Sequence, residues 1–88
     1  MKKLLERVQF QRPGTDACCE ARVAWNTKDV TFLHVPTMDG DKVVRLEVEV
    51  ARECEDGVFR RVENYKLDAA SENILRTLRE LAEATNRT

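Results

Sequence analysis

The sequence predicts an α+β fold in which a five-stranded antiparallel meander sheet is followed by one C-terminal helix packed on one face. Two observations lead to this prediction. Turn-forming residues interrupt most of the chain at short intervals, and the segments between them alternate between apolar and polar residues. The end of the chain changes to the apolar spacing of an amphipathic helix. With 88 residues, we expect a single domain over residues 1–88.

The strands are expected at about residues 4–11, 16–26, 29–37, 42–55 and 58–67. The turns between them are marked by Pro13-Gly14, by residues 26–29, by Asp39-Gly40 and by Asp56-Gly57. Asp-Gly is typical of two-residue hairpin loops, because such loops need positive φ angles that glycine adopts easily. The first and last strands would form the two free edges of an open sheet.

The registers follow from the loop lengths. A two-residue loop at Asp56-Gly57 would place Glu53 opposite Arg60, and opposite charges across a sheet stabilise the pairing modestly. A two-residue loop at the preceding Asp-Gly turn would place Leu33 opposite Leu46. These registers put the apolar residues of the last three strands on shared faces.

The loop at 26–29 leaves two alternatives. An odd loop length puts Val23 and Trp25 on the same face of the sheet as Leu33. An even length puts them on the face of Phe32, because a one-residue slip turns a whole strand over. We favour the odd length.

The helix is expected over about residues 69–84, with the Asp68 carboxylate capping its first turn. The apolar positions with helical spacing are Ile74, Leu75, Leu78, Leu81 and Ala82. This stripe should cover the more apolar face of the sheet, since each element must bury its apolar side. That face consists of Leu33, Val35, Val44, Leu46 and Val48.

Composition and charge exclude several classes of function. The chain carries 15 Lys and Arg against 16 Asp and Glu, a formal charge of −1, and no segment is strongly basic or acidic. No apolar run is long enough for a membrane span or a signal peptide, so we expect no membrane association. The odd number of cysteines, 3, without a paired spacing indicates a reducing, cytoplasmic location.

Motifs for catalysis, cofactors and metals are missing from the sequence. His34 is the only histidine, and no Ser or Cys stands at a spacing that predicts a catalytic dyad. Cys18 and Cys19 would point to opposite faces of a strand, so a four-ligand zinc site with Cys54 and His34 is not expected. The 3 glycines form no phosphate-binding loop. We therefore expect neither an enzyme nor a bound cofactor.

The second face of the predicted sheet leads to the main functional hypothesis. One helix covers one face, so an apolar stripe should remain on the other: Val30, Phe32, Pro36, Val43 and Val62. Exposed apolar stripes ringed by charge are typical of protein–protein interfaces. The sequence thus predicts a small interaction module that acts by contact, such as a phage- or bacterium-encoded inhibitor or an accessory subunit. The same stripe predicts a homodimer in addition to a protein partner.

Single-stranded nucleic-acid binding is the alternative hypothesis. Arg52, Arg60 and Arg61 lie near the last hairpin, and arginines beside aromatic rings can bind single strands. The element order in residues 41–84, strand, turn, strand and helix, resembles the end of single-stranded-DNA-binding coactivator domains of the positive-cofactor and whirly type. This resemblance implies a dimer and a DNA ligand. Nucleic acid is the less favoured partner, because acidic residues surround the three arginines.

Overall fold

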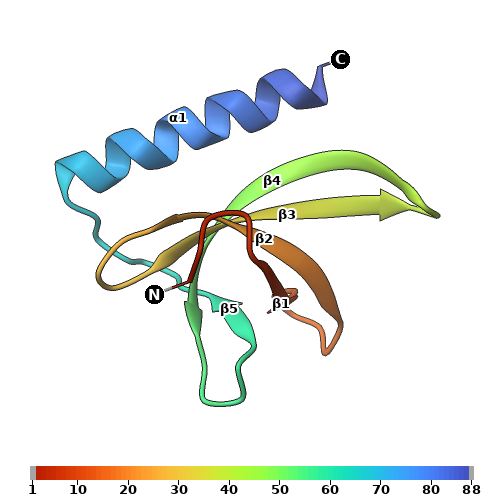
Figure 1. Ribbon diagram of the computed structural model, residues 1–88, viewed down its shortest axis with the longest axis horizontal. Coiled ribbons are helices and arrows are strands. Elements are labelled where there is room, and N and C mark those ends of the chain that lie inside the picture. The colour runs from red at the N-terminus through yellow and green to blue at the C-terminus, as the bar shows by residue number, and fades with distance from the viewer. Residues whose placement is uncertain (1, 88) are drawn as a thin grey trace.

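The computed structural model describes residues 2–87, which form five strands and one helix (Figure 1). They are β1 (Arg7–Gln11), β2 (Cys18–Asn26), β3 (Thr31–Asp39), β4 (Lys42–Glu53), β5 (Phe59–Arg61) and α1 (Ala69–Asn86). Each strand pairs antiparallel with the next, and α1 packs against the sheet. The predicted α+β fold class is therefore confirmed.

The sheet closes into a barrel, because β1 and β5 pair with each other in parallel. Phe10 lies opposite Phe59 at this seam. The expectation of an open sheet with two free edges is therefore wrong, since those two edges bind each other. β5 is also shorter than predicted, and residues 62–67 leave the barrel and lead to α1 (Figure 1).

The inside of the barrel holds one hydrophobic cluster. Its buried members are Val8, Phe10, Ala21, Val23, Leu33, Val35, Ala51 and Phe59. Leu33 and Val35 belong to this cluster, so the prediction that α1 covers them is wrong. The closed sheet buries this face by itself, and no further element is needed to cover it.

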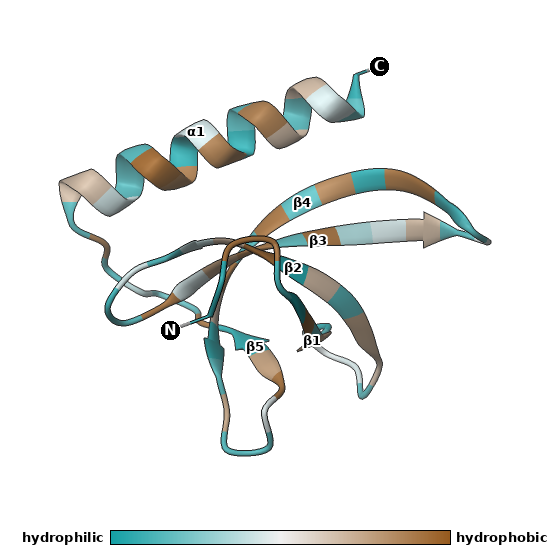
Figure 2. Cartoon of the chain, viewed as in Figure 1, coloured by the Kyte–Doolittle hydropathy of each residue, from teal (hydrophilic) through white to brown (hydrophobic). Residues whose placement is uncertain are grey.

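A second hydrophobic cluster lies between α1 and the outer face of β3 and β4 (Figure 2). Its buried members are Val30, Phe32, Val48, Leu75 and Ala82. Leu46 and Val48 lie in this cluster, as predicted, whereas Val44 remains 50% exposed. The helix therefore covers the face of β3 that was expected to stay open and the face of β4 that was expected to be covered.

The β4–β5 hairpin has a three-residue loop in place of the predicted two-residue loop. Cys54 N–H donates to the Val58 carbonyl at 3.0 Å, which closes the loop. Glu53 therefore lies opposite Phe59 and not opposite Arg60. This one-residue slip turns the Phe59 side chain into the barrel, where it is 1% exposed.

The β3–β4 hairpin also differs from its predicted register. Asp39 pairs with Lys42, so the two loop residues are one position later than expected, and a β-bulge follows near the tip. As a result, Leu33 lies opposite Glu49 and not opposite Leu46. The bulge changes which face the rest of β4 presents to the barrel.

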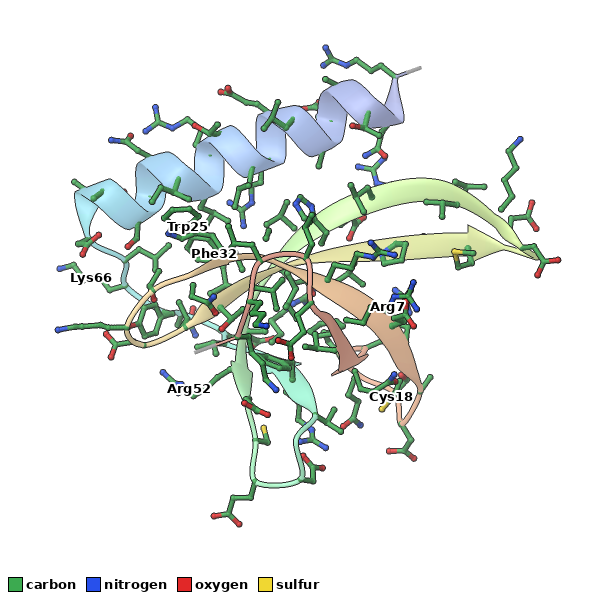
Figure 3. All side chains as sticks on the ribbon, viewed as in Figure 1. Arg7, Cys18, Trp25, Phe32, Arg52 and Lys66 are labelled. Atoms are coloured by element: carbon green, nitrogen blue, oxygen red, sulfur yellow. The ribbon has the colours of Figure 1, made fainter. Side chains whose placement is uncertain are left out.

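The odd-length alternative for the β2–β3 loop is confirmed for Val23, which lies opposite Leu33. It is wrong for Trp25, because a bulge after Val23 places Trp25 opposite Phe32. Figure 3 shows Trp25 and Phe32 together beneath α1. Trp25 remains 40% exposed, whereas Phe32 is fully buried.

Candidate protein-interaction surface

The five residues predicted to bind a partner do not form one surface. Val30 and Phe32 are buried beneath α1, at 3% and 0% exposure, and Val62 is half-buried against the same cluster. The prediction that this part of the stripe lies uncovered is wrong, because the barrel interior buries the other face and leaves α1 free to cover this one. Pro36 is half-buried further along β3, and Val43 is 54% exposed on β4.

β3 and β4 extend beyond the barrel as a two-stranded ribbon (Figure 1). In the described part of the chain, β2 pairs with β3 no further than His34, and β5 pairs with β4 only over Ala51–Glu53. Residues 35–39 and 42–47, which we call the distal ribbon, therefore pair with each other and have no further described strand on either side, although Arg12 Nη2 donates to the Pro36 carbonyl at 2.8 Å. Pro36 suits such an edge, because proline has no N–H to offer a neighbouring strand.

Three large apolar side chains are exposed near the end of the distal ribbon. Met38, Val43 and Val44, which we call the tip cluster, are 48%, 54% and 50% exposed. Met38 and Val43 are cross-strand partners, and Val44 is the extra residue of the bulge beside them. Figure 2 shows apolar residues on both strands in the part of the ribbon that extends past α1.

Of the tip cluster, the sequence predicted only Val43 as a partner-binding residue. Met38 and Val44 were missed because the predicted register placed Val44 beneath the helix and assigned Met38 to the turn. A signal for both was present, since apolar residues directly flank a short polar turn at residues 39–42. Apolar side chains at a hairpin tip have little chance of burial within the same domain.

The edge of β4 in the distal ribbon is closed at one point by α1. Leu46 N–H donates to Asn86 Oδ1 at 2.7 Å, and Asn86 Nδ2 donates to the Leu46 carbonyl at 2.9 Å. The amide satisfies both backbone groups of Leu46 and so takes the place of a neighbouring strand. Beside it, Arg45 Nε lies 3.1 Å from Glu47 Oε1, and these side chains are 61% and 51% exposed.

Two of the three arginines predicted to bind nucleic acid form hydrogen bonds with carboxylates. Arg60 bonds Asp56 at 2.9 and 3.1 Å, and this hydrogen bonding lowers the pKa of Asp56 to about 2 and raises the pKa of Arg60. Arg61 bonds Glu49 through both Nε and Nη2, with a shortest distance of 2.7 Å. Binding of phosphate by either arginine would have to compete with these contacts.

The third arginine, Arg52, lies directly opposite Arg60 across β4 and β5, but no carboxylate of the described residues holds its side chain in the same way. Arg52 Nε donates to the Asp29 carbonyl at 3.3 Å, and its guanidinium carbon lies 5.8 Å from the centroid of the Tyr65 ring. The Tyr65 hydroxyl in turn donates to Asp29 Oδ2 at 2.9 Å, and this hydrogen bond raises the pKa of Tyr65. These contacts tie the segment before α1 to the β2–β3 loop.

A surface cleft of about 690 Å³ opens beside the β2–β3 loop. Its charged lining residues are Lys2, Glu6, Lys28, Asp29, Arg52 and Glu53. Three of these residues are basic and three are acidic, so the lining has no net charge to attract a charged ligand.

The residues examined for catalysis or metal binding do not converge. His34 is half-buried, its Nδ1 has no hydrogen-bond partner within residues 2–87, and burial lowers its pKa. Cys18, Cys19 and Cys54 are free thiols. Among the residues that the structure describes, no three His, Cys, Asp or Glu side chains come together in a group that could hold a metal ion.

Comparison with known proteins leaves the chain without an assigned family. No protein-family model matches it, and neither the curated proteins nor the solved structures contain a significant match. Within residues 2–87, no helix combines the length and the apolar character that a membrane span requires.

Proposed function

We propose that the protein is a small non-enzymatic interaction module that acts by contact with a protein partner through the tip cluster. The observation that carries this proposal is the exposure of three large apolar side chains on a ribbon that projects from the barrel. Grouped apolar side chains on a surface are what protein partners bury. An inhibitor or an accessory subunit suits this arrangement, because either requires a contact surface and no chemistry of its own.

The tip cluster also indicates the kind of surface that the partner offers. A ribbon of two strands is narrow, so its apolar end fits an apolar groove better than a flat face. The flexible thioether side chain of Met38 can adapt to an irregular pocket. Asp39, Asp41 and Lys42 surround the cluster, so we expect charges of both signs around the partner's groove.

Matched charge substitutions test this proposal. Val43→Lys places a charge in the tip cluster, and Leu81→Lys places the same charge on α1 at a side chain that is 60% exposed. Affinity capture from the native host is expected to recover the same protein with wild type and Leu81→Lys, and at least about tenfold less of it with Val43→Lys. Equal recovery with both variants would show that the tip cluster is not the contact surface.

Single-stranded nucleic-acid binding has less support, because Arg60 and Arg61 are engaged by carboxylates and Arg52 is engaged by the Asp29 carbonyl and the Tyr65 ring. Phosphate contacts make affinity fall steeply with salt. We expect no binding of a labelled single-stranded oligonucleotide at low salt, measured by fluorescence anisotropy. Binding that weakens with salt and is lost in Arg61→Gln would support this alternative.

A further inference from the structure

We propose that the free edge of β4 in the distal ribbon pairs with β4 of a second copy of this chain, and that Asn86 closes this edge in the monomer. The proposal does not rest on the protein partner at the tip cluster, because it depends on backbone hydrogen bonds along one edge, although Val44 belongs to both surfaces. It concerns how the chain associates with itself.

The backbone of Leu46 presents a hydrogen-bond donor and an acceptor at the outer edge of β4. Both its N–H and its carbonyl point away from β3, since both bond the Asn86 side chain. An unpaired strand edge is a template for another strand, and natural proteins protect such edges with charges, proline or a covering element. The β3 edge carries Pro36, whereas the β4 edge carries no proline and is covered by a single amide.

The charges along β4 favour its own copy as the occupant. In a two-fold antiparallel pair centred on Leu46, each Arg45 lies opposite Glu47 of the second copy. Val44 then lies opposite Val48 of the second copy on the face that carries α1, where Val48 is 8% exposed, so this apolar pair would form at the border of the outer cluster. Opposite charges and branched apolar pairs are both stabilising across a sheet. Each pair occurs twice because the interface is symmetric.

Neighbouring registers lack this complementarity. A pair centred on Val48 places Glu47 opposite Glu49 of the second copy, and one centred on Val44 brings the turn residue Asp41 level with Glu47. Like charges directly opposite each other destabilise a sheet. The charge pattern of β4 therefore selects the register centred on Leu46, which is also the residue whose backbone groups face the edge.

Asn86 competes with the second copy, because both use the same backbone groups of Leu46. A cleft of about 340 Å³ lies between β4 and the last turns of α1, with Arg79, Glu83 and Asn86 on the helix side. Ala82, one turn before Asn86, is buried at 4% exposure against the sheet, so the amide is the contact that reaches past this packing to the edge of β4. When Asn86 no longer bonds Leu46, the backbone N–H and carbonyl of Leu46 become available to the second copy.

Charge substitutions at Arg45 and Glu47, made in a variant that lacks the Asn86 amide, test the proposal. Asn86→Ala is expected to increase the dimer fraction in sedimentation velocity relative to wild type at about 100 μM. In the Asn86→Ala background, Arg45→Glu and Glu47→Arg should each remain monomeric, because like charges then face each other. An equal mixture of the two should form dimers again, because each copy supplies the charge that the other lacks.

The mixture separates pairing across the interface from effects within one chain. Arg45 and Glu47 are exposed, so each variant is expected to keep the wild-type circular dichroism spectrum. Met38→Lys, in the tip cluster on β3, should leave the dimer fraction unchanged and so distinguishes this interface from the partner surface. A monomeric Asn86→Ala variant, or a mixture that stays monomeric, would overturn the proposal. A wild type that dimerises as strongly as Asn86→Ala would overturn the role of Asn86.

Discussion

Asp68 sets the residue at which α1 begins. It has extended backbone angles, φ −72° and ψ 169°, and its Oδ1 accepts a hydrogen bond from the Ser71 N–H at 2.7 Å. This backbone hydrogen bond favours the ionised carboxylate and lowers the pKa of Asp68. The N-cap was predicted from sequence, since a carboxylate in front of an apolar helical stripe has a purely local signal.

The pH dependence of Asp68→Ala tests the cap. Because the folded pKa is depressed, the stabilisation is present above the ordinary value of 3.8 and is lost as pH falls through the folded value. Asp68→Ala should therefore unfold at a lower temperature than wild type near neutral pH, and the two midpoints should converge in acid. Asp68→Asn, which keeps a capping oxygen, should show a smaller difference. A gap of constant size from about pH 7 to about pH 2 would contradict this assignment.

At the scale of elements, the sequence predicted the strands and the helix but not their loop lengths. Asp-Gly suits both two-residue and three-residue loops, because both have a position with positive φ for glycine. At the last hairpin the loop is longer by one residue, and Phe59 turns inward to lie opposite Glu53. Bulges in β2 and β4 leave no signal in the alternation of polarity, so the shifts at Trp25 and Val44 could not be foreseen.

The packing of α1 predicts different roles for two leucines of its apolar stripe. Leu78 is half-buried against the outer face of the sheet, whereas Leu81 is 60% exposed. Leu78→Asp should lower the free energy of unfolding by about 3 kcal/mol, because it buries a charge among apolar side chains. Leu81→Asp should change it by less than about 0.5 kcal/mol. Urea unfolding followed by circular dichroism measures both, and equal losses would contradict the position of the helix.

At the scale of the whole molecule, barrel closure explains why the predicted interface was only partly right. The sequence correctly indicated two apolar faces, and one helix cannot cover two faces of an open sheet. Closure depends on the pairing of β1 with β5, which are far apart in the chain and show no local signal of contact. Once one face is enclosed, Val30 and Phe32 lie beneath α1 and the apolar residues left exposed include those at the ribbon tip.

Phe59 tests the closed barrel. It is 1% exposed at the seam between β1 and β5, in contact with the interior cluster. Phe59→Ala should lower the free energy of unfolding by about 3–5 kcal/mol, because it leaves a cavity in a small core. Phe59→Leu keeps most of the volume and should cost less. If Phe59→Ala is as stable as wild type in chemical unfolding, the barrel seam is not formed as described.

Site-specific photo-crosslinking tests most directly whether the tip cluster is the contact surface. A photoreactive side chain at Val43, introduced in the native host, is expected to form a covalent adduct with a different protein. The same side chain at Leu81 is expected to form none, although Leu81 is the more exposed of the two, at 60% against 54%. Mass spectrometry then identifies the partner and the residues that contact the ribbon. Adducts of equal yield at both positions, or an adduct at Leu81 alone, would contradict the assignment of the tip cluster.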